Sequence, residues 1–67
     1  MSENTVELDV EVLAVSERAL FVKIEDDVEV WFPLSQIDVE KTDVKFTVGA
    51  TGTLVVTEWI AKQRGLS

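Results

Sequence analysis

Apolar and acidic side chains alternate along the first part of the chain. Residues 6–12 are apolar at every even position, and their odd positions are Glu7, Asp9 and Glu11. This is the period of a strand with one buried face, so the other face carries a row of carboxylates. The alternation is lost at residues 13–15, which predicts a β-bulge or a strand that bends from one side of a barrel to the other.

Two further alternating segments, 19–25 and 28–34, predict a β-hairpin. Their apolar faces are formed by Leu20, Val22 and Ile24 in the first segment and by Val28, Val30, Phe32 and Leu34 in the second. A two-residue loop at Asp26 and Asp27 would mix the two faces, because a shift of one residue turns a strand over. A loop of odd length, such as Glu25 to Asp27, keeps the apolar side chains together. We therefore predict a three-residue loop or a bulge.

This register gives the hairpin a second face, formed by Phe21, Lys23, Glu29, Trp31 and Pro33. Pro33 has no amide proton, so it fits an edge strand or the end of a strand. We expect the chain to leave the sheet there. The next residues, Ser35 to Ile37, are expected to form a turn or a short helical segment that returns Ile37 to the core.

The second half of the chain has a weaker strand pattern. Residues 38–45 are charged and predict a loop. A short strand is predicted from three alternating apolar residues, Val44, Phe46 and Val48. Residues 49–52 contain two glycines that accept positive φ and predict a turn, and residues 53–56 predict a core strand.

The last segment, TEWIAKQRG, has the signals of a short helix. Thr57 is a suitable N-cap, an acidic residue follows in the first turn, two basic residues lie in the last turn, and Gly65 follows as the C′ residue. A helix of two turns is unstable alone in water, so we expect Trp59 or Ile60 to dock it onto the sheet.

Five strands and one short helix predict a mainly β protein of one domain, residues 1–67. The strands are short and the chain is small, which favours a five-stranded SH3-like barrel, with an OB-like barrel as the alternative.

The composition excludes most catalytic and metal chemistry. The 67 residues contain no cysteine and no histidine, so thiolate zinc sites, disulfides and a histidine base are absent. Ser35 and Gln36 offer a hydroxyl without a base to activate it, and we expect them to bond backbone groups instead. The acidic run Glu25 to Asp27 with Glu29 lacks the spacing of a calcium loop. We expect no enzyme activity, no metal site and no cofactor.

Charge is distributed unevenly along the chain. Thirteen acidic and six basic residues give a net charge of −7; residues 1–43 carry −9 and residues 44–67 carry +2, which sum to −7. Duplex DNA binding draws affinity from Lys and Arg on phosphates, so it is disfavoured. An acidic surface instead fits a basic protein partner, although acidity can also serve only to keep a small domain soluble.

Nothing in the chain predicts membrane insertion. The amino terminus is polar and acidic, and the longest apolar run has four residues, far short of the roughly 20 that a spanning helix requires. We expect a soluble, cytoplasmic protein that does not contact a membrane.

Two blocks of the sequence carry a resemblance. VWFPLSQI (30–37) and GATGTLVVTEWIAKQRGL (49–66) resemble small proteins of unassigned role encoded in bacteriophage and prophage genomes. Those proteins share a strand that ends in W-x-P-x-S-Q-I and a C-terminal E-W-I helix followed by Gly-Leu. The resemblance does not cover the segment between the blocks. It implies a small β-barrel in the cytoplasm of a phage host and assigns no catalytic residue.

The candidate partner-binding residues are Glu7, Asp9, Glu11, Phe21, Lys23, Glu29 and Trp31. Three readings of Trp31 are open: coverage by the C-terminal helix, which we expect, an exposed partner site, or base stacking together with Phe21 and Lys23. The acidic row is either an ordinary solvated strand face or a mimic of spaced phosphates.

These observations favour a non-catalytic, phage-type protein-interaction module. Such a module would inhibit a host nucleic-acid-binding or defence complex as a DNA mimic or an anti-CRISPR-like protein. The alternative is an accessory protein that binds single-stranded nucleic acid through its aromatic face. An unpaired strand edge and an apolar outer face also favour a homodimer.

Overall fold

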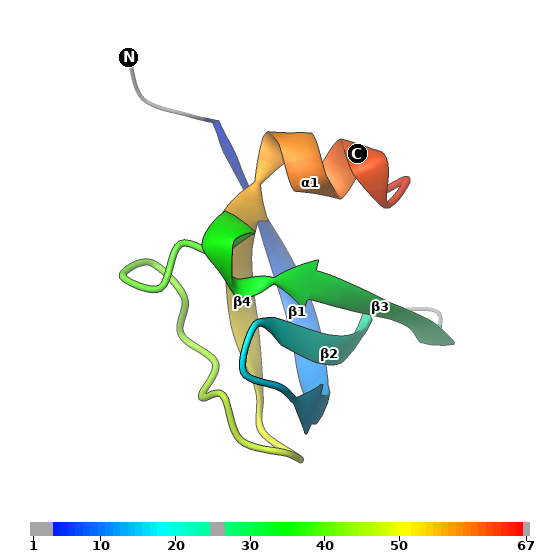
Figure 1. Ribbon diagram of the computed structural model, residues 1–67, viewed down its shortest axis with the longest axis vertical. Helices are drawn as coiled ribbons and strands as arrows, with labels where there is room; N and C mark the ends of the chain where they lie inside the picture. Colours follow the sequence, from blue (N-terminus) through cyan, green and yellow to red (C-terminus); the bar gives the residue numbers. More distant parts are fainter. Residues whose placement is uncertain (1–3, 25–26, 67) are drawn as a thin grey trace.

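The computed structural model describes residues 4–24 and 27–66. Its elements are β1 (Thr5–Val15), β2 (Ala19–Ile24), β3 (Val28–Pro33), the 3₁₀ helix η2 (Leu34–Gln36), β4 (Thr51–Thr57) and α1 (Glu58–Gln63). The strands form one antiparallel sheet in the order β3-β2-β1-β4 (Figure 1). The protein is therefore mainly β, with an unclosed sheet and one short C-terminal helix.

β1 is the long strand that joins the two parts of the sheet. Residues 5–11 pair with β4 and residues 10–15 pair with β2. The register with β2 shifts between Val12 and Ala14, so Leu13 is the extra residue of a β-bulge. The predicted bulge is confirmed, and it increases the local bend of the strand.

The β2–β3 hairpin has the predicted register. Ile24 pairs with Val28 and Leu20 pairs with Phe32, which puts the apolar side chains on one face. The pairing leaves residues 25–27 between the two strands, as expected for an odd loop; Glu25 and Asp26 lie outside the described residues. Asp27 has a φ of 60°, the left-handed conformation that Asp tolerates in turns.

Pro33 ends β3, which is an edge strand, and η2 follows at once. Ile37 is buried and forms an isolated antiparallel bridge with Val56 of β4. The predicted exit at Pro33 and the return of Ile37 to the core are both confirmed.

The predicted strand through Val44, Phe46 and Val48 is wrong. This segment is a loop, in which the Thr47 amide donates to the Lys45 carbonyl and the Ala50 amide donates to the Thr47 carbonyl. Val44 is buried while Val48 is 65% exposed, so the alternate apolar residues do not share one buried face. Four strands, rather than five, form the sheet in the described residues.

One hydrophobic core fills the inner face of the sheet. Its buried members are Val10, Val12, Leu20, Val22, Phe32, Ile37, Val44, Leu54, Val56, Ile60 and Ala61. The core therefore takes residues from all four strands, the loop and the helix.

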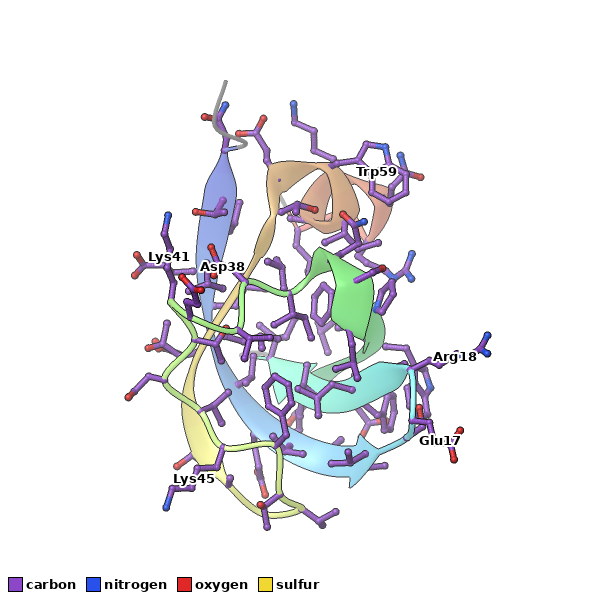
Figure 2. All side chains as sticks on the ribbon, turned by 60° about the vertical axis from the view of Figure 1, so that its left-hand side comes forward. Glu17, Arg18, Asp38, Lys41, Lys45 and Trp59 are labelled. Atoms are coloured by element: carbon purple, nitrogen blue, oxygen red, sulfur yellow. The ribbon has the colours of Figure 1, made fainter. Side chains whose placement is uncertain are left out.

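α1 has the predicted boundaries and caps. The Thr57 hydroxyl accepts a hydrogen bond from the Ile60 amide, and Gly65 has a φ of 73°. The amides of Gly65 and Leu66 donate to carbonyls of the last turn, which completes a Schellman motif. Ile60 docks the helix, whereas Trp59 is 59% exposed on its outer side (Figure 2). In the described part of the chain, no helix has the length and hydrophobicity needed to cross a lipid bilayer.

Candidate functional site

The outer face of the sheet brings the predicted partner-binding residues together in two groups. Side chains alternate across a sheet, so the residues between the core positions point outward. Glu11 pairs with Lys23, and Lys23 pairs with Glu29, in a row across three strands. On one side of this row lie Phe21 and Trp31, and on the other side lie Glu7 and Asp9 of β1.

Phe21 and Trp31 form a stacked pair. They are direct cross-strand partners, and their ring centroids are 4.7 Å apart with 26° between the planes. The Leu34 amide donates to the Arg18 carbonyl, so the even residues of β2 carry the backbone bonds to β3 and the Phe21–Trp31 pair is not bonded through its backbone. Side chains lie closest together in such pairs.

Trp31 is 45% exposed, so the expectation that the C-terminal helix covers it is wrong. The helix docks through Ile60 and Ala61 on the core side of the sheet, and the Trp31 ring is on the opposite side. The helix end reaches only the Trp31 backbone: Nε of Arg64 donates to its carbonyl at 3.0 Å. Sequence reasoning missed this contact, because no local signal links residues so far apart in the chain.

The aromatic pair belongs to a larger apolar surface. Ala14 pairs with Phe21, and Ala19 pairs with Pro33 beside the stack. We call these five residues the aromatic patch. All but Trp31 are partly buried, which leaves the indole as the most exposed apolar ring of the patch.

Three cations lie around the aromatic patch. Lys23 is next to Phe21 on the same face, and its Nζ is 3.8 Å from the Asp27 carboxylate. The carbonyl of Arg18 accepts from the amide of Leu34, which places Arg18 at the Pro33 end of the patch, and its side chain extends into solvent (Figure 2). Arg64 lies at the outer edge of β3, where its Nε donates to the Trp31 carbonyl. Half of the six basic residues of the chain therefore surround this patch.

Glu7, Asp9 and Glu11 form the acidic row. Glu7 and Asp9 are exposed and Glu11 is half-buried. Their partners on β4 are uncharged, namely Val55, Thr53 and Thr51. The ion pairs between described residues are Lys23–Asp27 and Lys62–Glu58, so neither compensates the row. None of the three carboxylates forms an ion pair with a described residue; Glu7 and Asp9 present their charge to solvent, and Lys23 lies across from Glu11.

A shallow depression of about 420 Å³ lies at the end of the acidic row. It is lined by Asp9, Glu11 and Lys23 together with Val10, Ile24, Thr51 and Gly52. Its lining is too open to enclose a small molecule, but it offers two carboxylates to a cationic side chain of a partner.

A second depression, of about 370 Å³, lies beside η2. Its lining includes Ser35, Gln36, Asp38, Lys41 and Thr57. Gln36 Oε1 accepts a 2.7 Å hydrogen bond from the Thr57 hydroxyl, not from a backbone group as expected, and this bond ties η2 to the start of α1. The sequence contains no histidine, so no imidazole lies beside Ser35.

No group of three or more acidic side chains suited to a metal ion occurs in residues 4–24 and 27–66. The acidic run Glu25 to Asp27 is only partly within this range, since Glu25 and Asp26 lie outside the described residues. No protein family matches the chain, and neither a curated protein nor a solved structure resembles it closely enough to count as a match.

Proposed function

We propose that this protein is a non-catalytic interaction module that binds a basic protein partner through the acidic row. The observation that carries the proposal is a set of carboxylates at alternate positions of one strand, none of them in an ion pair with a described residue, in a chain of net charge −7. Alternate residues of a strand are about 7 Å apart. A rigid, evenly spaced line of negative charge complements a basic surface and steers its approach.

The phage resemblance extends this proposal to a class of partner. A host protein that binds nucleic acid has a basic surface built to hold regularly spaced phosphates. The acidic row would occupy such a surface as a DNA mimic, including that of a defence complex, in the cytoplasm of the host. The order of elements, three strands followed by a 3₁₀ turn and a fourth strand, supports an SH3-like over an OB-like arrangement for this module.

Affinity capture from a nuclease-treated bacterial lysate tests the proposal. The baits are the wild-type protein, a variant with Glu7, Asp9 and Glu11 changed to Lys, and a control with Glu17, Glu40 and Asp43 changed to Lys. Both variants change the net charge equally, and the control residues are exposed in turns and the loop. The proposal predicts a partner that the wild type and the control retain and that the acidic-row variant loses. Equal loss with both variants would show that only total charge matters.

The aromatic patch supports a second candidate, the binding of single-stranded nucleic acid. An exposed indole stacked on Phe21, with Arg18, Lys23 and Arg64 nearby, has the aromatic and cationic groups that hold bases and phosphates. Trp31→Ala would abolish this activity, while reversal of the acidic row would leave or improve it. Fluorescence anisotropy with a labelled oligothymidylate separates the two candidates.

A further inference from the structure

The edges of the sheet differ in what covers them. β4 is an edge strand, but the loop that precedes it bonds the outer backbone groups of Val55 and the carbonyl of Thr53. The amide of Asp38 donates to the Val55 carbonyl, the amides of Asp43 and Val44 donate to the Thr53 carbonyl, and the Val55 amide donates to the Thr42 hydroxyl. The loop therefore occupies this edge at Thr53 and Val55.

The outer edge of β3 is blocked at Trp31 and Pro33, and in a different way. The Ser16 amide donates to the Ala19 carbonyl, so the odd residues of β2 point toward β1 and the even residues point toward β3. The odd residues of β3 then point outward. Of these, Pro33 has no amide proton and the Trp31 carbonyl already accepts from Arg64. Proline and a charged side chain are common means of preventing strand addition at an edge.

β1 has an open edge of its own over Thr5 to Leu8. At both ends of its pairing with β4, the even residues point toward β4: the Asn4 carbonyl accepts from the Glu58 amide, and the Val12 amide donates to the Ala50 carbonyl. Thr5 and Glu7 therefore direct their amides and carbonyls away from β4. β2 pairs with β1 only from Val10 onward (Figure 1). Among the described residues, nothing bonds the backbone of Glu7 on this side.

The inner side chains of the same segment are incompletely covered. Val10 and Val12, where β2 flanks β1, are 5% and 0% exposed. Val6 and Leu8 have the same orientation but are only partly buried. Within residues 4–24 and 27–66, the segment thus has no neighbouring strand on this side, either for its backbone groups or for its apolar face.

We propose that this open edge of β1 accepts a basic, extended segment of the partner as an added strand. The proposal rests on the proposed function and names its binding mode. The added strand would bond the amides and carbonyls of Thr5 and Glu7. Its outward side chains would be Lys or Arg beside Glu7 and Asp9, and its inward side chains would be apolar beside Val6 and Leu8.

Charge decides between a foreign segment and a second copy of the chain. Antiparallel self-pairing of this edge would set the carboxylates of two copies beside each other, which is destabilising across strands. The same carboxylates favour lysine or arginine at those positions. The acidic row therefore protects the edge from self-association and selects a basic strand.

Amide hydrogen exchange on the ¹⁵N-labelled protein tests the open edge directly. In the free protein the Glu7 amide should exchange much faster than the Leu8 amide, which points toward β4. A short synthetic peptide with alternating lysine and valine should slow exchange at Thr5 and Glu7, and one with glutamate and valine should not. Equal protection of Glu7 and Leu8 in the free protein would overturn the proposal.

Two substitutions at one position separate strand addition from simple charge attraction. Glu7→Ala and Glu7→Pro both remove the carboxylate, but only proline removes the amide proton. Proline should weaken binding of the lysine–valine peptide roughly 3- to 10-fold more than alanine, the effect of one lost hydrogen bond. It should leave the protein folded, because proline is tolerated where the amide faces solvent; unfolding would mean that the amide is already bonded.

The outcomes distinguish this inference from the proposed function. If the lysine–valine peptide binds but alanine and proline weaken it equally and Glu7 stays unprotected, strand addition is wrong and binding through the acidic row stands. If it binds no more tightly than the glutamate–valine peptide, both are wrong.

Discussion

Trp31 and Phe32 are neighbours on β3 that point to opposite faces of the sheet, Trp31 to the outer face and Phe32 into the core. Replacing each with alanine tests this assignment. Phe32 is the largest fully buried side chain of the core. Its removal should cost about 3–5 kcal/mol, the usual cost of an aromatic core truncation. Trp31→Ala removes the stacking contact with Phe21 and the buried part of the indole, about half of the side chain, since Trp31 is 45% exposed. These two losses together should lower the free energy of unfolding by about 2 kcal/mol.

The difference of about 2 kcal/mol should be easy to measure. A domain of this size has a total stability of roughly 3–10 kcal/mol. Phe32→Ala should therefore approach global unfolding, while Trp31→Ala should remain folded with a melting temperature about 8–16 °C above that of Phe32→Ala.

Urea denaturation followed by far-ultraviolet circular dichroism is the appropriate assay, because it does not depend on the fluorescence of the residue removed. Equal m-values would show that both variants unfold from the same compact state. Equal costs for the two substitutions would refute the reasoning, since Trp31 would then belong to the core and could not serve a partner.

Three further predictions concern the helix cap, the loop and the acidic row. Thr57→Ala removes the hydrogen bonds to the Ile60 amide and to Gln36 and should lower the free energy of unfolding by about 1–2 kcal/mol. Thr57→Ser should lower it by less. An unchanged melting temperature for the alanine variant would contradict the role of Thr57 as the helix cap. Gly52→Ala places a Cβ 3.0 Å from the Val44 Cα and should lower the free energy of unfolding by about 1–3 kcal/mol through overpacking. An unchanged free energy of unfolding in a denaturation experiment would show that the loop around Val44 moves to make room. Lysine at all three positions of the acidic row changes the net charge from −7 to −1, because each reversal adds two. The melting temperature should stay constant or rise, because the repulsion between like charges falls. A fall of more than about 5 °C would assign these carboxylates a structural role.

The period of the side chains was enough to predict the elements with strong alternation. The bulge at Leu13, the odd hairpin loop and the exit at Pro33 all followed from the requirement that apolar residues share one face. The helix followed from its caps, Thr57 and Gly65. These are local signals, and the structure contains each of them.

The incorrect predictions concern contacts that depend on distant parts of the chain. Val44, Phe46 and Val48 alternate like a strand, but their backbone bonds locally and to β4 as a loop. Trp31 was expected beneath the helix, yet the helix direction depends on where Ile60 enters the core. The open edge of β1 could not be seen either, because it depends on where β2 stops.

The candidate site was predictable in its residues and not in its arrangement. Alternation placed the acidic row and the Phe21–Trp31 pair on the outer face, as observed. Their separation into a carboxylate row and a patch surrounded by cations depends on cross-strand pairing and on Arg64, which returns from the end of the chain.

Amide chemical-shift mapping of the ¹⁵N-labelled protein tests the central claim most directly, with a lysine-rich polypeptide and an oligothymidylate as separate titrants. We predict that the polypeptide shifts the amides of Glu7, Asp9 and Glu11, that salt weakens this binding, and that the oligonucleotide causes no comparable shifts. Shifts centred on Phe21 and Trp31 with the oligonucleotide, and none along the acidic row with the polypeptide, would contradict the account and assign binding to the aromatic patch.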